Sequence, residues 1–121
     1  MPFELVAGAA PTSRVIRMAI KKLFILEPAP LEESRLARLV VERPDLSLSG
    51  VAADLAVTLE SCADDEPDAL IVDLSAEAGD GIALIERLHS ECRQLSILAL
   101  SARTDSRVIE RILRAGAMGC V

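Results

Sequence analysis

Two carboxylates stand directly after apolar runs, where a parallel sheet would place a functional site. Glu27 follows LFIL (23–26), and Asp73 follows ALIV (69–72). If both runs form buried parallel strands, the carboxylates lie at the carboxyl ends of those strands, where such sheets bind their ligands. Carboxylates that converge in a crevice are typical of catalytic or ligand-binding sites. Two alternatives stay open: Asp73 ends a strand and caps a turn, and Glu27 is a solvated strand end.

The elements around these carboxylates alternate between strands and helices. Strands that are separated by helices are parallel, with right-handed crossovers. We therefore expect an α/β fold with a doubly wound, five-stranded parallel sheet of order 2-1-3-4-5 (flavodoxin-like), whose switch point lies between the first and third strands. The expected strands are 23–26, 46–54, 69–73, 96–100 and one beginning in 118–121; the expected helices are 31–44, 54–62, 82–92 and 106–115.

Residue types at the ends and on the faces of the helices support this order. Asp54 is a suitable N-cap, Gly116 closes the last helix, and ADDEP (63–67) predicts a turn. Asp80 is expected to cap a helix or turn together with Gly81. The apolar positions that we expect to face the core are Leu31, Leu36, Leu39 and Val40 in the first helix and Ile82, Leu84, Ile85 and Leu88 in the third.

Composition excludes several classes of function. The chain has 121 residues, 51% of them hydrophobic and 26% charged, which suits one globular core. Only Phe3 and Phe24 are aromatic, so stacking on bases is not expected. The net charge of −6 and the pI near 4.8 argue against a nucleic-acid surface. The apolar stretches are too short to span a membrane and no basic segment precedes the first, so we expect a cytoplasmic protein.

The cysteines and the single histidine do not form a metal-ligand pattern. Cys62, Cys92 and Cys120 are far apart, with no CxxC or Cys/His spacing, so a zinc site is not expected. We interpret the cysteines as packing residues of a protein in a reducing compartment. His89 falls on the outer side of its expected helix, which favours a surface residue over a phosphorelay histidine.

The first 20 residues differ from the regular pattern that follows. They contain a short apolar stretch, Gly8 and Pro11, and a segment with Thr12 or Ser13 as a candidate helix cap. We interpret residues 1–20 as an N-terminal arm, which packs on the domain or on a second copy, or as upstream sequence. The regular domain is expected to span 21–121.

The motifs of this domain resemble those of the receiver domain of bacterial two-component response regulators. In IVDLSAEAGDGIALI, an Asp-Gly pair stands seven and eight residues after the aspartate that ends the strand. PDALIVDL, ILALSA and ILRAGAMGCV also stand at spacings that the family shows. The resemblance runs from about Lys21 to Val121.

The resemblance implies roles for the residues at the strand ends. In the family, the aspartate after the third strand accepts a phosphoryl group from a histidine kinase; here this nucleophile would be Asp73. Mg²⁺ offsets the negative charge and prefers oxygen ligands, which by position would be Asp73, Glu27 and the backbone carbonyl of Ser75. The hydroxyl that follows the phosphoryl state would be that of Ser101.

Several positions depart from the family pattern. Pro28 follows Glu27 where the family has a second acid, and residues 75–78 replace the usual Met-Pro loop. Cys120 stands where an aromatic residue usually begins the fifth strand. The usual lysine and the last helix of the fold would fall after Val121. We therefore expect a divergent receiver, truncated at its C-terminus, with the last helix missing.

Two hypotheses about function follow. The first is a phospho-accepting receiver that switches a partner-binding face; it is not an enzyme in its own right. Its partners would be a histidine kinase or phosphotransfer protein and an output domain or protein beyond this chain. The alternative, favoured by Pro28, is a phosphorylation-independent pseudo-receiver that serves protein interaction or dimerisation. A nucleotide-binding domain is disfavoured, because no GxGxxG or P-loop is present and EPAPLEE (27–33) is acidic.

The last expected helix carries a basic set with two interpretations. It is a solvated face with i,i+4 ion pairs, or it is a surface for a partner such as a second copy of the chain. Neither a membrane nor direct nucleic-acid contact is expected for this segment. The residues are Arg103, Arg107, Arg111 and Arg114.

Overall fold

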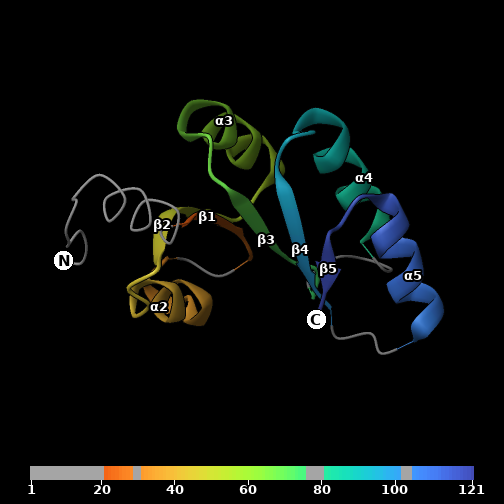
Figure 1. Cartoon of the computed structure of the whole chain (residues 1–121), viewed down its shortest axis with the longest axis horizontal. Helices are drawn as coiled ribbons and strands as arrows, with labels where there is room; N and C mark the ends of the chain where they lie inside the picture. The colour runs from red at the N-terminus through yellow and green to blue at the C-terminus, as the bar shows by residue number, and fades with distance from the viewer. Residues whose placement is uncertain (1–20, 29–30, 76–80, 102–104) are drawn as a thin grey trace, which may run out of the picture.

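The apolar runs form one parallel sheet (Figure 1). The computed structural model describes residues 21–28, 31–75, 81–101 and 105–121. The strand order is β2-β1-β3-β4-β5 and each neighbouring pair is parallel, which confirms the predicted fold class. The strands are β1 (Lys21–Leu26), β2 (Leu46–Ala52), β3 (Ala69–Asp73), β4 (Ser96–Leu100) and β5 (Gly119–Cys120).

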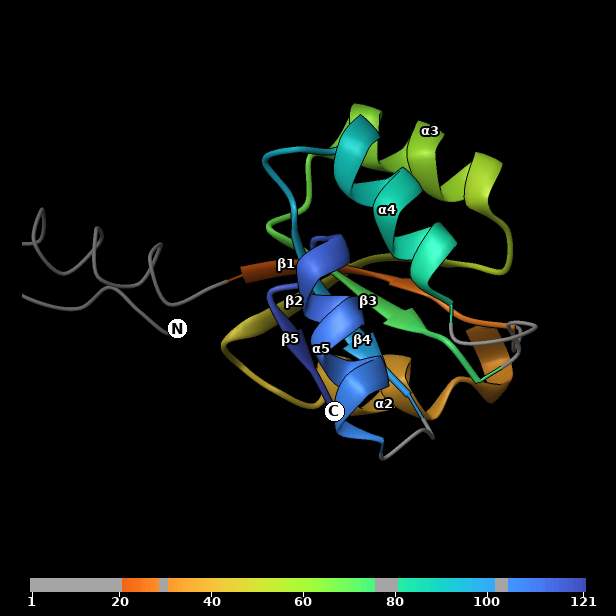
Figure 2. The same ribbon diagram turned by 90° about the vertical axis from the view of Figure 1, so that its right-hand side faces the viewer.

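Helices cover the two faces of the sheet unequally (Figure 2). On one face, a cluster around Leu70, Val72 and Ile97 is packed by side chains of α3, α4 and α5. On the other face, Ile25 packs with Ala37 of α2. The described helices are η1, a 3-10 turn (Leu31–Glu33), α2 (Arg35–Val41), α3 (Leu55–Asp65), α4 (Ile82–Glu91) and α5 (Ser106–Ala115).

The predicted helix at 31–44 is wrong in its extent. A 3-10 turn comes first, and α2 starts only after Ser34, whose side-chain oxygen accepts a hydrogen bond from the Ala37 N–H at 2.9 Å. This cap satisfies one of the free N–H groups of the first helical turn. Leu39, expected in the core, is 61% exposed, whereas Ala37 is buried instead.

The other helices follow the prediction more closely. Asp54 caps α3, as expected, by accepting a hydrogen bond from the Val57 N–H at 2.8 Å. The predicted turn at 63–67 is partly wrong, because α3 continues to Asp65 and ends where Glu66 adopts the left-handed conformation at φ 48°. The inward face of α4 is confirmed: its buried positions are Ile85 and Leu88, with Ile82 and Leu84 packed against the same cluster.

Gly81 directly precedes α4. It is the N-cap of α4 and has φ 76°, in the left-handed region that disfavours residues with a Cβ atom. A Cβ atom at this position would lie 2.7 Å from Cδ2 of Leu74, which is 4% exposed. The sequence prediction that Gly81 takes part in a helix start is confirmed, whereas Asp80 lies outside the described residues, as do residues 1–20 and Arg103.

We expect Gly81→Ala to lower the free energy of unfolding by about 2 kcal/mol, because the left-handed conformation alone costs a residue with a Cβ about 1–2 kcal/mol and Leu74 must also move. Urea unfolding followed by far-ultraviolet circular dichroism measures this loss. Gly119→Ala is the matched control, since Gly119 has no positive φ and its nearest neighbour would lie 3.1 Å away. An equal loss in both variants would contradict the role given to the Gly81 backbone.

Candidate functional site

The register between β1 and β3 brings Glu27 and Asp73 to the same edge of the sheet. Leu26 pairs with Val72, so the residues that follow each of them stand side by side at the carboxyl ends of adjacent strands. Leu26 and Val72 both pack into the cluster beneath α3, α4 and α5. Because side chains alternate along a strand, Glu27 and Asp73 project from the opposite face of the sheet, the face that carries α2.

Glu27 is buried, contrary to the alternative of a solvated strand end. It is 7% exposed, and its backbone N–H donates to the carbonyl oxygen of Ala52 at 2.9 Å. Its Oε1 atom is buried and has no hydrogen-bond partner among the described residues. A buried polar atom without a partner costs about 1–3 kcal/mol, and more when it is charged. A cation or a water molecule at this position would remove that cost.

Asp73 is half-buried and is oriented by the turn that follows it. Its Oδ1 atom accepts a hydrogen bond from the Ser75 N–H at 2.9 Å. The intervening Leu74 donates its N–H to the carbonyl oxygen of Leu100 at 2.8 Å and is buried against Gly81. Asp73 therefore does cap the turn that follows β3, through its hydrogen bond from the Ser75 N–H. The same bond fixes the carboxylate beside Glu27, so the two roles are compatible.

Ser101 lies at the same edge of the sheet, after β4. Asp73 pairs with Leu100 across β3 and β4, and Ser101 is the next residue. The Ser101 N–H donates to the carbonyl oxygen of Val121 at 2.9 Å, which ties this position to the residue after β5. The structure thus brings Glu27, Asp73 and Ser101 to the ends of three strands, β1, β3 and β4.

The donor atoms at this edge fit a hard cation. The carboxylates of Glu27 and Asp73 and the carbonyl of the exposed Ser75 are all oxygen donors, which Mg²⁺ prefers over nitrogen and sulfur. In the described part of the chain, no three His, Cys, Asp or Glu side chains gather as a metal site. A cation here would therefore depend on two carboxylates, with carbonyl and water oxygens completing its coordination. Pro28 stands where a third carboxylate would strengthen the set.

The remaining candidate residues lie elsewhere. Arg114 pairs with Glu110 at 3.2 Å, four residues before it on α5, which is the i,i+4 pairing of a solvated face. Asp105 caps the same helix by accepting from the Arg107 N–H at 2.9 Å. His89 is exposed, as predicted, and lies against Gly116, so it joins α4 to the end of α5.

Sequence reasoning missed the part that Leu74 plays in this site. Leu74 is the buried residue that locks the backbone between Asp73 and Ser75, through its contact with Gly81 and its hydrogen bond to β4. The sequence did contain a signal for this role, because an apolar residue directly after a strand-ending aspartate is expected to pack into the core. No described helix is both long and apolar enough to cross a membrane.

Known proteins resemble this chain in sequence and in fold. The family model described as the response regulator receiver domain matches residues 24–121. The chain is 30% identical over 100 residues to a protein-glutamate methylesterase/protein-glutamine glutaminase of Methylobacillus flagellatus, covering 83% of this chain and 28% of that protein. It is 33% identical over 103 residues to a Pseudomonas aeruginosa protein named as a transcriptional regulator, covering 84% of this chain and 49% of that protein. The chain thus spans at most about half the length of these relatives.

Solved structures share the fold. A two-component response regulator of the LuxR family from Aurantimonas sp. SI85-9A1 superposes with a TM-score of 0.72 at 21% identity, covering 84% of this chain and 72% of that one. The family match includes β3 with Asp73, β4 and β5. The chain therefore belongs to the response regulator receiver domains.

Proposed function

We propose that this receiver domain accepts a phosphoryl group on Asp73 and that the change is transmitted to a partner-binding face. The observation that carries the proposal is the buried Glu27 carboxylate beside Asp73, whose Oε1 atom has no hydrogen-bond partner among the described residues. A packed protein does not retain such an atom without a cost. A cation bound at a phosphoryl site would supply the missing partner of this oxygen atom.

The transfer uses Asp73 as the nucleophile. A carboxylate oxygen of Asp73 forms a bond to phosphorus while the bond from phosphorus to a donor nitrogen, such as a kinase histidine, breaks; the donor nitrogen leaves with the electron pair. Bound Mg²⁺, held by Glu27, Asp73 and the carbonyl of Ser75, would supply positive charge against the three phosphoryl oxygens. The Ser75 N–H already orients the Asp73 carboxylate.

Ser101 is the proposed reporter of the phosphoryl group. Its hydroxyl would donate a hydrogen bond to a phosphoryl oxygen on Asp73, a charge-assisted contact. Its backbone N–H is already joined to the carbonyl of Val121. A movement of Ser101 would therefore reach Val121 at the end of β5. The exposed apolar residues of the neighbouring α5–β5 region are Leu113 and Met118.

The partners and boundaries are part of this proposal. Receiver domains exchange signals with histidine kinases and output domains, and we propose a kinase or phosphotransfer protein as the donor here. Residues 21–121 are the proposed receiver domain, and residues 1–20 are proposed to be an N-terminal arm or an upstream segment. A methylesterase and a transcriptional regulator are named among relatives that are longer than this chain, so an enzymatic or regulatory output would lie outside the receiver. A homodimer and a cytoplasmic location remain predictions.

A pseudo-receiver is the second candidate, and Pro28 favours it. Pro28 supplies no oxygen side chain, so the site has only two carboxylates. If these do not bind Mg²⁺ tightly enough for transfer, the domain acts through its surface alone. In that case the state of Asp73 has no effect on its partner.

Incubation of the full chain with Mg²⁺ and phosphoramidate, a small phosphodonor, should give one phosphoryl adduct by intact-protein mass spectrometry. We expect Asp73→Asn to abolish the adduct, because an amide oxygen is not an adequate nucleophile. Asp64→Asn, a change at an exposed position of α3, is the matched control and should keep it. No adduct on the wild-type chain, or an adduct that survives Asp73→Asn, would leave the pseudo-receiver as the better account.

Glu27→Gln should have opposite effects on stability and on metal binding. Without Mg²⁺, the variant should unfold at a higher urea concentration, with about 1 kcal/mol more stability, because a neutral amide replaces a buried carboxylate that lacks a partner. With Mg²⁺, the wild type should gain stability as ligand binding is linked to folding, and the variant should gain much less. Equal Mg²⁺-dependent gains in the two proteins would remove Glu27 from the metal site.

A further inference from the structure

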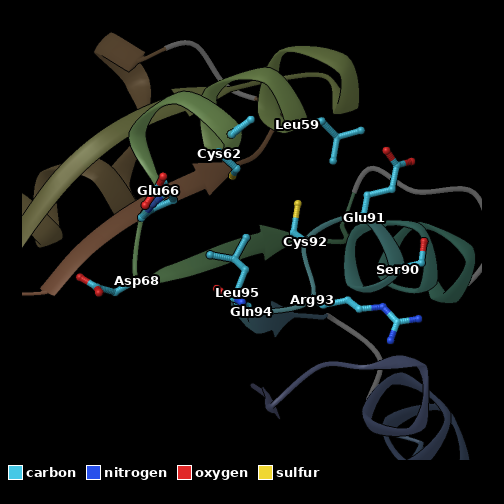
Figure 3. Close-up of a pocket in the computed structure, with 12 residues that line it drawn as sticks. Leu59, Cys62, Glu66, Asp68, Ser90, Glu91, Cys92, Arg93, Gln94 and Leu95 are labelled. Carbon is cyan, nitrogen blue, oxygen red and sulfur yellow. The ribbon is translucent and has the colours of Figure 1, made fainter.

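A cavity lies at the edge of the sheet opposite to Asp73 (Figure 3). Asp68 and Leu95 line it and directly precede β3 and β4, so it lies at the amino ends of these strands. Its volume is about 850 Å³, and it is bounded by the C-terminal ends of α3 and α4. This cavity is therefore separate from the proposed phosphoryl site at the carboxyl edge.

Two of the three cysteines line this cavity. Cys62 belongs to α3, Cys92 is the C-cap of α4, and both line the cavity. They also share one apolar cluster, in which Cys62 is a buried member and Cys92 packs against it. In Figure 3 the side chain of Cys92 points from the end of α4 towards the turn of α3 that carries Cys62. Both thiols are free. Cys120, in β5, packs against the same cluster but is not among the residues that line the cavity.

The two thiols differ in reactivity. Burial, together with the charges of Cys92 and Asp65, raises the pKa of Cys62 to about 11. Burial and Glu91 raise the pKa of Cys92, which is more exposed than Cys62. Because only the thiolate attacks, both react slowly near neutral pH and faster as the pH rises. Cys92, the more exposed thiol, is the one that a reagent meets first, and Cys62 lines the same cavity.

The charges around the cavity select the reagent. Three acidic side chains and one basic side chain line it, and one of the three, Glu91, is paired with Arg87 of α4. The remaining excess is one negative charge, Glu66 and Asp68 against Arg93, so the potential favours cations over anions. Among the described residues no three His, Cys, Asp or Glu side chains form a metal site, which leaves the thiol pair without a third ligand for a structural metal. The charged lining residues are Glu66, Asp68, Glu91 and Arg93.

We propose that Cys62 and Cys92 form a reversible dithiol–disulfide site that reacts with small disulfides, preferentially cationic ones. The Cys92 thiolate attacks one sulfur of the reagent, whose S–S bond breaks, and a thiolate leaves and takes up a proton. The Cys62 thiolate then attacks the Cys92 sulfur of the mixed disulfide and releases the second thiol. Two electrons pass from the protein to the reagent, and a thiol reductant reverses the sequence.

The bond would join the ends of α3 and α4. It closes a loop of about 30 residues that contains β3 and the acceptor Asp73, so the reduced unfolded chain has more conformational freedom than the oxidised one. The oxidised domain should therefore resist unfolding better than the reduced domain.

Cystamine, a small dicationic disulfide, is the probe for this site. The reduced full chain is incubated with cystamine, the remaining thiols are alkylated with iodoacetamide, and the intact protein is analysed by mass spectrometry. We expect the wild type to lose two hydrogen atoms and to carry one alkyl group, on Cys120, with peptide mapping showing the link between Cys62 and Cys92. Cys120→Ser should form the same link with no alkyl group.

Glutathione disulfide, which is anionic, should react about tenfold more slowly than cystamine at low salt, and the difference should shrink as salt screens the charges of the cavity.

The single-cysteine variants separate the two steps. Cys62→Ser should stop at a mixed disulfide on Cys92, and Cys92→Ser should react about tenfold more slowly than the wild type because its remaining cavity thiol is buried. The oxidised wild type should also show a higher urea midpoint than the reduced protein. Mixed disulfides without an internal link, a link that includes Cys120, or a link that forms only in urea or lowers the midpoint would each overturn the proposal.

Discussion

The parallel register of β1 against β3 is the constraint on which the site depends. Leu26 opposite Val72 sets Glu27 opposite Asp73, and the burial of Leu26 and Val72 under three helices holds that register. A slip of one residue would turn the side chains of either strand to the other face. The apolar residues before the two carboxylates are therefore what places the carboxylates together, although they take no part in the chemistry.

The site is held at some expense of stability. Glu27 is buried with an oxygen that accepts no hydrogen bond from the described residues, whereas the neighbouring Asp73 is oriented by the Ser75 N–H. In the proposed site, the Glu27 carboxylate would meet a cation, and the Asp73 carboxylate would be the nucleophile. Because Pro28 leaves the proposed site with two carboxylates, the burial of Glu27 has more weight here than it would in a site with three acids.

Features that depend on a few neighbouring residues could be predicted from the sequence. Features that depend on how distant elements pack could not. The run 69–73 and the cap at Asp54 are local, because strand period and side-chain capping act over a few residues. Leu39 fits a helical apolar pattern as well as Ala37 does, and only the way α2 lies on the sheet decides that Leu39 is exposed. The burial of Glu27 and the position of Cys62 and Cys92 at one cavity depend on elements that are far apart in the chain, so no short stretch of sequence predicts them.

The central claim is that Asp73 and Glu27 form a metal-assisted phosphoryl site despite Pro28. Fluorine NMR of the full chain with beryllofluoride, which stands in for the phosphoryl group, tests it most directly. We expect a protein-bound fluorine signal that requires Mg²⁺ and is absent from Asp73→Asn. Free beryllofluoride signals alone at saturating Mg²⁺, or a bound signal that persists in Asp73→Asn, would contradict the account.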